Sequence, residues 1–342
     1  MKPKKQKKDA FYERVVALLE SARSMAVQQV NQTMVAAYFE IGRMIVEEQQ
    51  GGDDRAGYGE DLINALSRKL TDRFGKGFSS VNLRQMRTFY LTYSKQQTLS
   101  AKSGRNQSSS DLSRLSWSHY LKLMRMDDLL ERRFYEIECV ENNWSVRELQ
   151  RQYGSGLYQR LAASRDKNKV RELSEKGLII QKAQDAVKDP YILEFLGLPE
   201  KTAYSEQELE TELINKLEAF LLELGKGFTF AGRQKRITID EKHFYIDLVF
   251  YNRLLQCFVL LDLKIGELKH QDLGQMQMYV NYYDRYVKLD EENKTVGIIL
   301  CRDKSKAVVE ITLPEDNEQI FASKYHTALP NKEELKKLLQ QK

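Results

Sequence analysis

Two short apolar stretches decide the fold: Tyr245-Ile246-Asp247-Leu248-Val249-Phe250-Tyr251 and Leu261-Asp262-Leu263-Lys264. Both are rich in β-branched and aromatic residues and a short connection joins them, so we predict adjacent strands of a hairpin. Burying an unpaired carboxylate costs on the order of several kcal/mol, so Asp247 and Asp262 need a shared partner. A divalent cation suits them, although a structural ion pair with Lys264 is an equally simple explanation.

The composition sets limits on the class of protein. The chain has 342 residues, 42% of them hydrophobic, which allows about two domains with cores of their own. No run of about eighteen apolar residues occurs, and no apolar segment follows the basic N-terminal residues, so we expect a soluble, cytoplasmic protein without a membrane partner. Three cysteines without C-x-x-C spacing argue against a disulfide framework or a zinc site. The net charge of +5 is compatible with a polyanionic partner.

Changes in periodicity divide the chain into four segments. We predict a disordered basic tail over residues 1–10, an all-helical N-terminal domain over 11–165, a charged junction over 166–200 and an α/β domain over 201–342. Within the helical domain, the Ser-rich segment 95–111 is expected to be a flexible loop. The helical domain would bind DNA or a partner protein, and a winged-helix-like arrangement is one form that it could take.

Arginines on the predicted helices are candidates for contacts with nucleic-acid phosphates. We single out Arg84, Arg87, Arg147 and Arg151 for this role. Charged residues on helices most often form a solvated face, and that alternative stays open.

One acidic residue of the α/β domain is expected to face the sheet. A capping box that begins at Ser205 opens a helix that we expect to run to Gly225. On a helical wheel Glu210 falls inside the apolar arc, whereas Glu212 and Glu223 fall outside it. Alternatively, Glu210 is partly solvated in the first turn and merely complements the helix dipole.

The remaining pattern predicts the architecture of the α/β domain. We expect strands over residues 228–239, 243–251 and 256–265, with Gly266 ending the third, then a helix over 271–286 and a last strand over 295–302. This order predicts a central mixed sheet flanked by helices.

Within this architecture the predicted site residues have distinct roles. Glu210, Asp247 and Asp262 offer the hard oxygen ligands that Mg²⁺ (or Mn²⁺) prefers, and such an ion activates water and neutralises phosphate charge. Lys264 shares a strand face with Asp262 and would orient the water or stabilise the phosphorane. Gln275, on the following helix, would bind the water or the phosphate. We therefore predict Asp247, Asp262, Lys264 and Gln275 as catalytic; the Asp-x-Lys triplet alone is weak, and the order of all the elements strengthens it.

The same residues resemble a known family. Glu210, Asp247 and Asp262-Leu263-Lys264 are similar to the core of the PD-(D/E)xK nuclease superfamily. Longer phrases in both halves of the chain resemble its YhcG-like branch: Phe220-Leu221-Leu222-Glu223-Leu224-Gly225-Lys226-Gly227-Phe228, Phe244-Tyr245-Ile246-Asp247, Gly274-Gln275-Met276, Phe39-Glu40-Ile41-Gly42-Arg43, Phe74-Gly75-Lys76-Gly77-Phe78-Ser79, Leu115-Ser116-Trp117-Ser118-His119-Tyr120 and Trp144-Ser145-Val146-Arg147-Glu148-Leu149.

The resemblance implies a restriction-endonuclease-like fold and a bacterial, metal-dependent DNA endonuclease that serves DNA processing or defence. Asp262 stands where this branch usually has glutamate, and Phe39 where tryptophan or tyrosine is more usual. The alternative is a catalytically inactive module that keeps the nuclease fold and binds nucleic acid or a protein. A homodimer and a protein partner for the helical domain are both compatible with the sequence.

Overall fold

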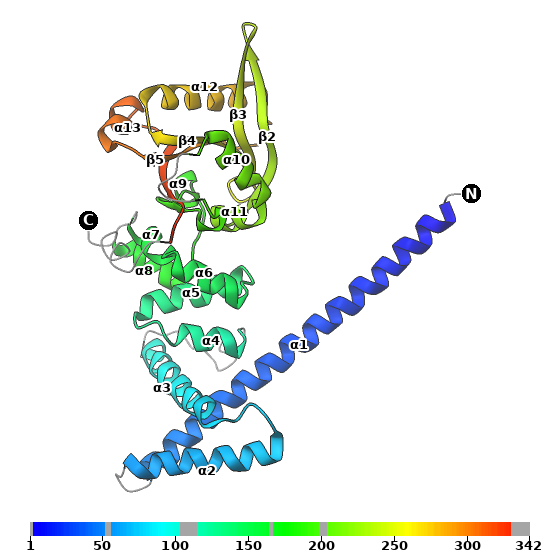
Figure 1. Cartoon of the computed structure of the whole chain (residues 1–342), viewed down its shortest axis with the longest axis vertical. Coiled ribbons are helices and arrows are strands. Elements are labelled where there is room, and N and C mark those ends of the chain that lie inside the picture. The colour runs from blue at the N-terminus through cyan, green and yellow to red at the C-terminus, as the bar shows by residue number, and fades with distance from the viewer. Residues whose placement is uncertain (1–2, 52–55, 103–114, 164–166, 199–203, 330–342) are drawn as a thin grey trace. The chain divides into compact units, whose positions relative to one another are not determined.

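The computed structural model describes residues 3–51, 56–102, 115–163, 167–198 and 204–329 (Figure 1). The chain forms two compact units, residues 1–132 with 139–146, and residues 133–138 with 147–342. This division falls earlier in the chain than the boundary near residue 165 that the sequence suggests. No helix in the described ranges is long and apolar enough to cross a membrane.

The first unit is built from helices. They are α1 (Pro3–Gly51), α2 (Ala56–Phe74), α3 (Ser80–Lys102), α4 (Trp117–Leu123) and the two ends of α5 (Leu129–Glu141). The described residues of this unit include no strand, so they contain no β-hairpin wing. Since α3 continues to Lys102, the first part of the predicted loop 95–111 is helical, and residues 103–111 lie outside the described ranges.

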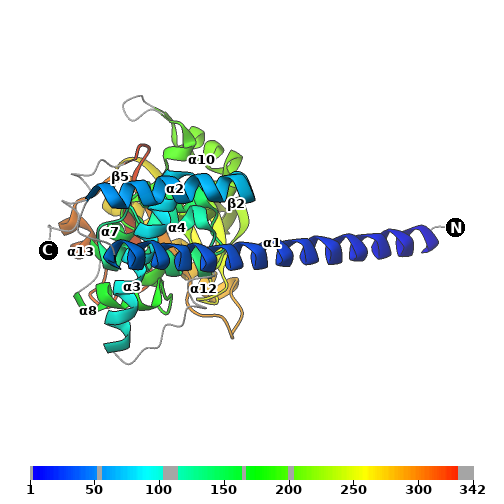
Figure 2. The ribbon, with the colours of Figure 1, turned by 90° about the horizontal axis from the view of Figure 1, so that it is seen from below.

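Helix α1 is a single unbroken helix (Figure 2). The prediction of a disordered tail over residues 1–10 is therefore wrong from Pro3 onward. The physical reason is local: lysine, glutamine and alanine favour helix, and proline is well suited to the first helical position. Gly42 lets α1 approach α3 closely, because a Cβ there would collide with the backbone carbonyl of Met86.

Two sets of buried side chains form the core of the first unit. One is aliphatic and the other aromatic, and their members are Ile45, Ile63, Leu83 and Met86, and Phe39, Phe89, Tyr93 and Tyr120. Trp117 packs on both sets and donates its indole N–H to Asn82 Oδ1 at 3.0 Å. The His119 ring lies 2.7 Å from Ser116 Oγ and 3.0 Å from the Trp144 carbonyl, contacts that hold the helix connection in place.

The second unit contains a six-stranded mixed sheet. In spatial order its strands are β1 (Tyr191–Ile192), β6 (Ile320–His326), β5 (Val296–Asp303), β4 (Cys257–Glu267), β3 (Lys242–Asn252) and β2 (Phe228–Ile239). Strands β2, β3 and β4 form an antiparallel meander, and β4, β5, β6 and β1 run parallel. The mixed sheet is as predicted, but strands β1 and β6 were not predicted, and β4 continues through Gly266, where the prediction ended it.

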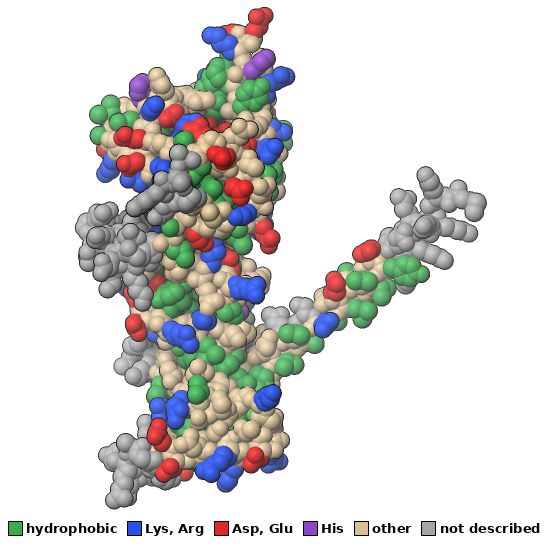
Figure 3. All heavy atoms as spheres, in the orientation of Figure 1, with side chains coloured by type: hydrophobic (Ala, Val, Ile, Leu, Met, Phe, Trp, Pro, Cys, Tyr) green, Lys and Arg blue, Asp and Glu red, His purple; other side chains and the backbone are tan. Residues whose placement is uncertain are grey.

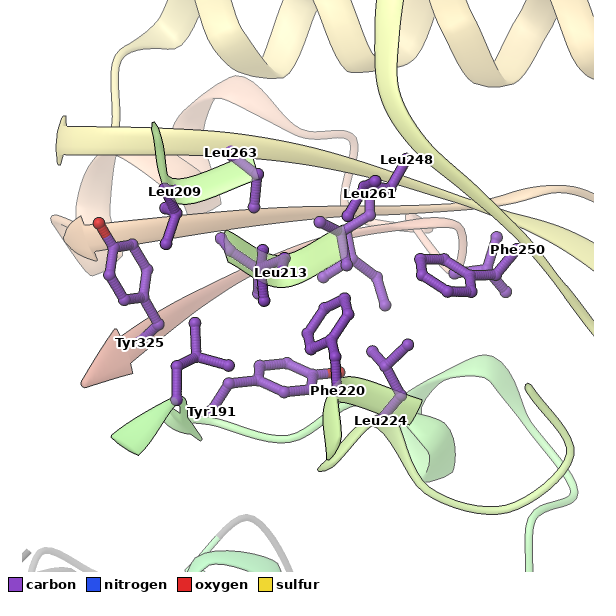
Figure 4. Packing of buried hydrophobic residues seen from close by; sticks show 14 of the residues in the cluster. Tyr191, Leu209, Leu213, Phe220, Leu224, Leu248, Phe250, Leu261, Leu263 and Tyr325 are labelled. Carbon is purple, nitrogen blue, oxygen red and sulfur yellow. The ribbon is translucent and has the colours of Figure 1, made fainter. Parts of the chain in front are cut away.

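Helices cover both faces of this sheet (Figure 1). On one face lie α10 (Glu206–Asn215) and α11 (Leu217–Leu224), and Figure 4 shows Leu209 and Leu213 packed toward Leu261 and Leu263. On the other face lies α12 (His270–Tyr286), packed against alternate residues of the same strands, with α13 (Lys306–Thr312) nearby. Side chains alternate between faces along a strand, so one apolar run fills both cores.

A buried ion network joins α6 (Val146–Gly154) and α7 (Leu157–Ala163) to α11. Glu223 is 0% exposed, and its Oε1 accepts from Arg160 Nη1 at 2.7 Å and from the Ile192 backbone N–H at 3.0 Å. Arg151 contacts Glu223 Oε2 at 3.3 Å and Glu194 Oε1 at 2.8 Å. Buried Lys188 donates to the backbone carbonyl of Glu223. These contacts explain why α7 and most of α6 belong to the second unit.

Two predictions concern this network. Arg151 binds carboxylates of its own unit, which argues against its predicted role as a phosphate contact. Glu223 was expected outside the apolar arc and is fully buried. The wheel assumed one straight helix, whereas the backbone breaks at Lys216, with φ −119° and ψ 35°, and gives α11 an axis of its own.

The network holds the Glu223 carboxylate ionised. Burial by itself would raise the pKa of Glu223, but the charges of Arg160, Lys188 and Arg151 outweigh burial and lower the pKa to about 2. The folded pKa thus lies below the 4.5 of an unperturbed glutamate. The stability that Glu223 contributes is therefore present above about pH 4.5 and is lost as the pH falls toward 2.

We predict that Glu223→Gln lowers the free energy of unfolding at pH 7 by about 3–5 kcal/mol, because the buried arginines lose their counter-charge. The loss should shrink as the pH falls from about 4.5 toward 2, because Glu223 takes up a proton first in the unfolded chain and only near pH 2 in the native one. Urea denaturation at about pH 7 and pH 3 measures both effects. Glu218→Gln, at an exposed position of the same helix, is the matched control. Equal stability of the two variants at pH 7 would contradict this account.

Candidate active site

The pairing of β3 with β4 brings two predicted acids together. It runs from Asn252 opposite Cys257 to Leu248 opposite Leu261, and Asp247 and Asp262 are the next residue on each strand. Asp247 Oδ2 accepts a hydrogen bond from the backbone N–H of Leu263 at 2.8 Å. The predicted hairpin is confirmed, and the two carboxylates lie on neighbouring strands.

Asp262 and Lys264 form an ion pair on β4. Lys264 Nζ lies 2.8 Å from Asp262 Oδ2 and 3.9 Å from Glu206 Oε2. Residues two apart on a strand project from the same face, so the Asp-x-Lys spacing produces this contact directly. Asp262 is 3% exposed, whereas the Lys264 side chain remains 18% exposed.

Burial and neighbouring charges act differently on the pKa values of Asp262 and Lys264. Burial raises the pKa of Asp262 to about 7, and the neighbouring charge of Asp247 adds to the rise, while Lys264 opposes it. Burial lowers the pKa of Lys264, but the charges of Asp262 and Glu206 outweigh burial, and its pKa is raised overall. Lys264 is thus held as an ammonium group beside a carboxyl whose charge is only partly compensated.

Glu210 lies in the same region, as predicted from the helical wheel. It is 7% exposed, and its Oε2 accepts from Gln234 Nε2 at 2.6 Å. The same amide nitrogen lies 3.1 Å from Asp247 Oδ1, so Gln234 links the two acids. Burial raises the pKa of Glu210, the hydrogen bond from Gln234 lowers it, and the charge of Asp247 raises it again.

Gln234 is the residue of this site that the sequence did not reveal. Its neighbours Arg233 and Lys235 pair with Leu248 and Ile246, so Gln234 stands across from Asp247. Its φ of 45° is left-handed, which is uncommon for a residue with a side chain. An ionised carboxylate only accepts hydrogen bonds, so the amide nitrogen must face both acids. A single glutamine in a basic strand does not indicate, from the sequence alone, that it will link two carboxylates.

The other predicted residues are placed differently. Gln275 donates to the hydroxyl of Tyr279 at 2.5 Å, and that hydroxyl donates to the Tyr245 carbonyl at 2.9 Å, so Gln275 is tied to β3 two residues before Asp247. Arg84 and Arg87 lie in the first unit, where Arg84 is 3.4 Å from Glu60 and Arg87 is 3.2 Å from Gln49. The remaining arginine, Arg147, has an exposed side chain on α6.

The donor chemistry fits a hard divalent cation. Glu210, Asp247 and Asp262 offer carboxylate oxygens, and the raised pKa of Asp262 indicates a buried charge that a cation would compensate. In this conformation, however, Gln234 links Glu210 to Asp247 while Lys264 pairs with Asp262. Accordingly, no three His, Cys, Asp or Glu residues within the described ranges converge as a metal site.

A mixed sheet covered by helices, with acids on adjacent strands and an Asp-x-Lys triplet, defines a restriction-endonuclease-like nuclease domain. Two family models match the chain: the DUF1016 N-terminal domain over residues 14–160 and the YhcG PDDEXK nuclease domain over residues 184–340. The candidate nuclease YhcG of Escherichia coli (strain K12) is 38% identical over 345 residues, covering 95% of this chain and 92% of that protein. The chain belongs to the YhcG family of PD-(D/E)xK nucleases.

Two solved structures resemble part of the chain. A repair endonuclease from Pyrococcus abyssi matches at 17% identity and a TM-score of 0.26, over 38% of this chain and 50% of that one. An EndoMS–dsDNA2 complex matches at 19% identity and a TM-score of 0.27, over 39% of this chain and 49% of that one.

We predict that Gln234→Met lowers the Tm of metal-free protein by about 2–4 °C at pH 7.5, because Glu210 and Asp247 lose their shared donor and repel each other. In an Asp247→Asn background the same substitution should cost less, since one charge is already gone. Differential scanning calorimetry in EDTA measures this double-mutant cycle. Gln207→Met, at an exposed position of α10, is the control; a Gln234 effect that is equal in both backgrounds would refute the coupling.

Proposed function

We propose that this chain is a divalent-metal-dependent DNA endonuclease that hydrolyses phosphodiester bonds. The observation that carries the proposal is the buried Asp262–Lys264 ion pair of 2.8 Å on the strand next to Asp247. An ion pair made only for stability would not require the second acid, whose charge raises the pKa of Asp262 further. The order of acidic helix, acidic strand and Asp-x-Lys strand supports the same conclusion.

Glu210, Asp247 and Asp262 would hold Mg²⁺ or Mn²⁺. Such a cation, when bound, supplies charge neutralisation for the phosphate oxygens and makes water a better nucleophile. Lys264 would direct its ammonium group at the attacking water or at a phosphate oxygen, where negative charge develops in the transition state. Asp262 keeps Lys264 in place and charged. Gln234 would have to release Asp247 or Glu210 when these acids take up the cation.

Gln275 has a narrower role in this proposal than the sequence suggests. Its hydrogen bond to Tyr279, and the bond from Tyr279 to the Tyr245 carbonyl, anchor β3 just before Asp247. This contact favours a positioning role over direct binding of water or phosphate. We propose further that the helical unit contacts DNA or a partner protein in bacterial DNA processing or defence. Arg84, with a side chain 40% exposed, is a candidate contact there, and Arg147 is one on α6.

Lys264→Ala should reduce DNA cleavage by about 10²–10³-fold, because one electrostatic contact to the transition state is lost. Single-turnover cleavage of duplex, single-stranded and branched DNA with Mg²⁺ or Mn²⁺ measures the effect. Lys294→Ala, at an exposed lysine just before β5, is the matched control and should cleave normally. The proposal fails if wild type cleaves none of these substrates, or if Lys264→Ala cleaves as well as wild type.

Asp247→Asn should abolish Mn²⁺ binding, because it removes a charged ligand from a set of three. Isothermal titration calorimetry measures binding directly, without any cleavage, and Asp290→Asn at an exposed position is the control. Retained Mn²⁺ affinity in Asp247→Asn would instead support the alternative function, an inactive module whose nucleic-acid binding weakens with salt and ignores metal.

A further inference from the structure

The β2–β3 hairpin continues past the site carboxylates, where β3 no longer pairs with β4. The β3–β4 pairing stops at Leu248 opposite Leu261, whereas β2 and β3 stay paired as far as Ile239 opposite Lys242. Figure 1 shows this hairpin projecting at the top of the sheet. We call residues 235–246 the β-arm. Because Gln234 stands across from Asp247, the β-arm begins directly at the candidate active site.

The β-arm is a fixed element. Ile237 is buried, and Ile237, Phe244 and Ile239 pack in the same cluster as α12, which anchors one side of the arm. Thr238 Oγ1 lies 3.0 Å from His243 Nδ1 across the two strands. The turn residues Asp240 and Glu241 have φ of 46° and 65°, the left-handed pair that a tight two-residue hairpin turn requires. The arm therefore presents its outer side chains in a defined arrangement.

Positive charge gathers on the arm and at its base. Arg233, Lys235, Arg236 and Lys242 are exposed, and within the described ranges none of them forms an ion pair. Figure 3 shows blue side chains along this hairpin, with red at its tip. Some exposed cations elsewhere have acidic neighbours, as in the pairs Arg171–Glu175, Lys176–Glu172 and Lys306–Glu310, and others, such as Lys182 and Arg253, form no ion pair in the described ranges. What distinguishes the arm is that four exposed cations gather on one hairpin beside the site carboxylates, which favours an anionic partner.

The dimensions of the arm fit duplex DNA. A two-stranded β-ribbon fits the major groove, which is about 12 Å wide. Lys242 lies five positions before Asp247 on β3, which at about 3.3 Å per residue is roughly 17 Å. When a phosphate of the duplex lies at Asp247 and Asp262, the cations of the arm can therefore reach other phosphates across the groove. Proteins that bind single strands rely on stacked aromatic residues, and of its phenylalanine and tyrosine side chains the arm exposes only Tyr245.

We infer that the β-arm binds the backbone of duplex DNA through Lys235, Arg236 and Lys242 and holds the duplex against Asp247 and Asp262. This inference rests on the proposed nuclease function, to which it adds duplex DNA as the substrate class. The contacts come from the stems of the arm, because Asp240 and Glu241 place negative charge at its tip. Arg233 is not included among these DNA contacts, because its charge also acts on the candidate metal ligand Glu210, whose pKa it lowers.

The test is the triple variant Lys235→Gln/Arg236→Gln/Lys242→Gln, in which glutamine keeps the polar surface of the strands. Fluorescence anisotropy with a labelled duplex oligonucleotide, in EDTA and over a series of KCl concentrations, gives the affinity and its salt dependence. We expect weaker duplex binding and a salt slope shallower by about 0.9 for each cation that contacts a phosphate. The matched control is Lys182→Gln/Arg253→Gln/Lys294→Gln, which removes three exposed cations from the opposite end of the sheet.

Two further measurements separate this inference from the proposed function. Unchanged Mn²⁺ binding and Tm would show that the triple variant is folded with an intact site. If it then binds duplex with the wild-type affinity and slope, if wild type binds no duplex, or if a single strand of equal length loses as much affinity, the inference is overturned. If the triple variant loses duplex affinity but wild type cleaves nothing with Mg²⁺ or Mn²⁺, the inference that the arm binds DNA is supported and the nuclease proposal fails.

Discussion

The register between β3 and β4 is the constraint on which the site depends. Leu248 opposite Leu261 fills one core and Val249 opposite Leu260 fills the other, so a slip by one residue would exchange the faces of a whole strand. Both faces of β3 and β4 are buried, so a slip would expose apolar side chains to water and lower the stability of the fold. Asp247 and Asp262 are therefore fixed as neighbours by side chains that take no part in the chemistry.

Local sequence patterns predicted most of the fold of the second unit and part of the candidate active site. Alternation and apolar runs predicted β2 at its observed bounds, β3, β4, α12 and β5 within a few residues, and the face of α10 that buries Glu210. All three cysteines are buried. The contact between Asp262 and Lys264 follows from strand geometry alone. Each of these features is set by residues close together in the chain, which is why sequence periodicity reports it.

The features that could not be predicted depend on distant partners. Glu223 is buried because arginines about seventy residues away neutralise it, and the break at Lys216 that turns it inward has no proline or glycine to announce it. Gln234 owes its role to a left-handed backbone and to acids on two other elements. Strand β6 forms by parallel pairing with β5, and β1 by pairing with β6, neither of which leaves a hairpin signal.

The Glu223 network has a consequence for how this chain can be divided. The sequence match to the nuclease domain begins at residue 184, but both arginines that neutralise Glu223 precede that point. A fragment cut there would bury a carboxylate without two of its counter-charges, although every candidate catalytic residue would remain. The smallest piece that recombination could transplant intact therefore includes α6 and α7. An exchange of the N-terminal helices of this chain that keeps Glu223 neutralised would need its break point before Arg151.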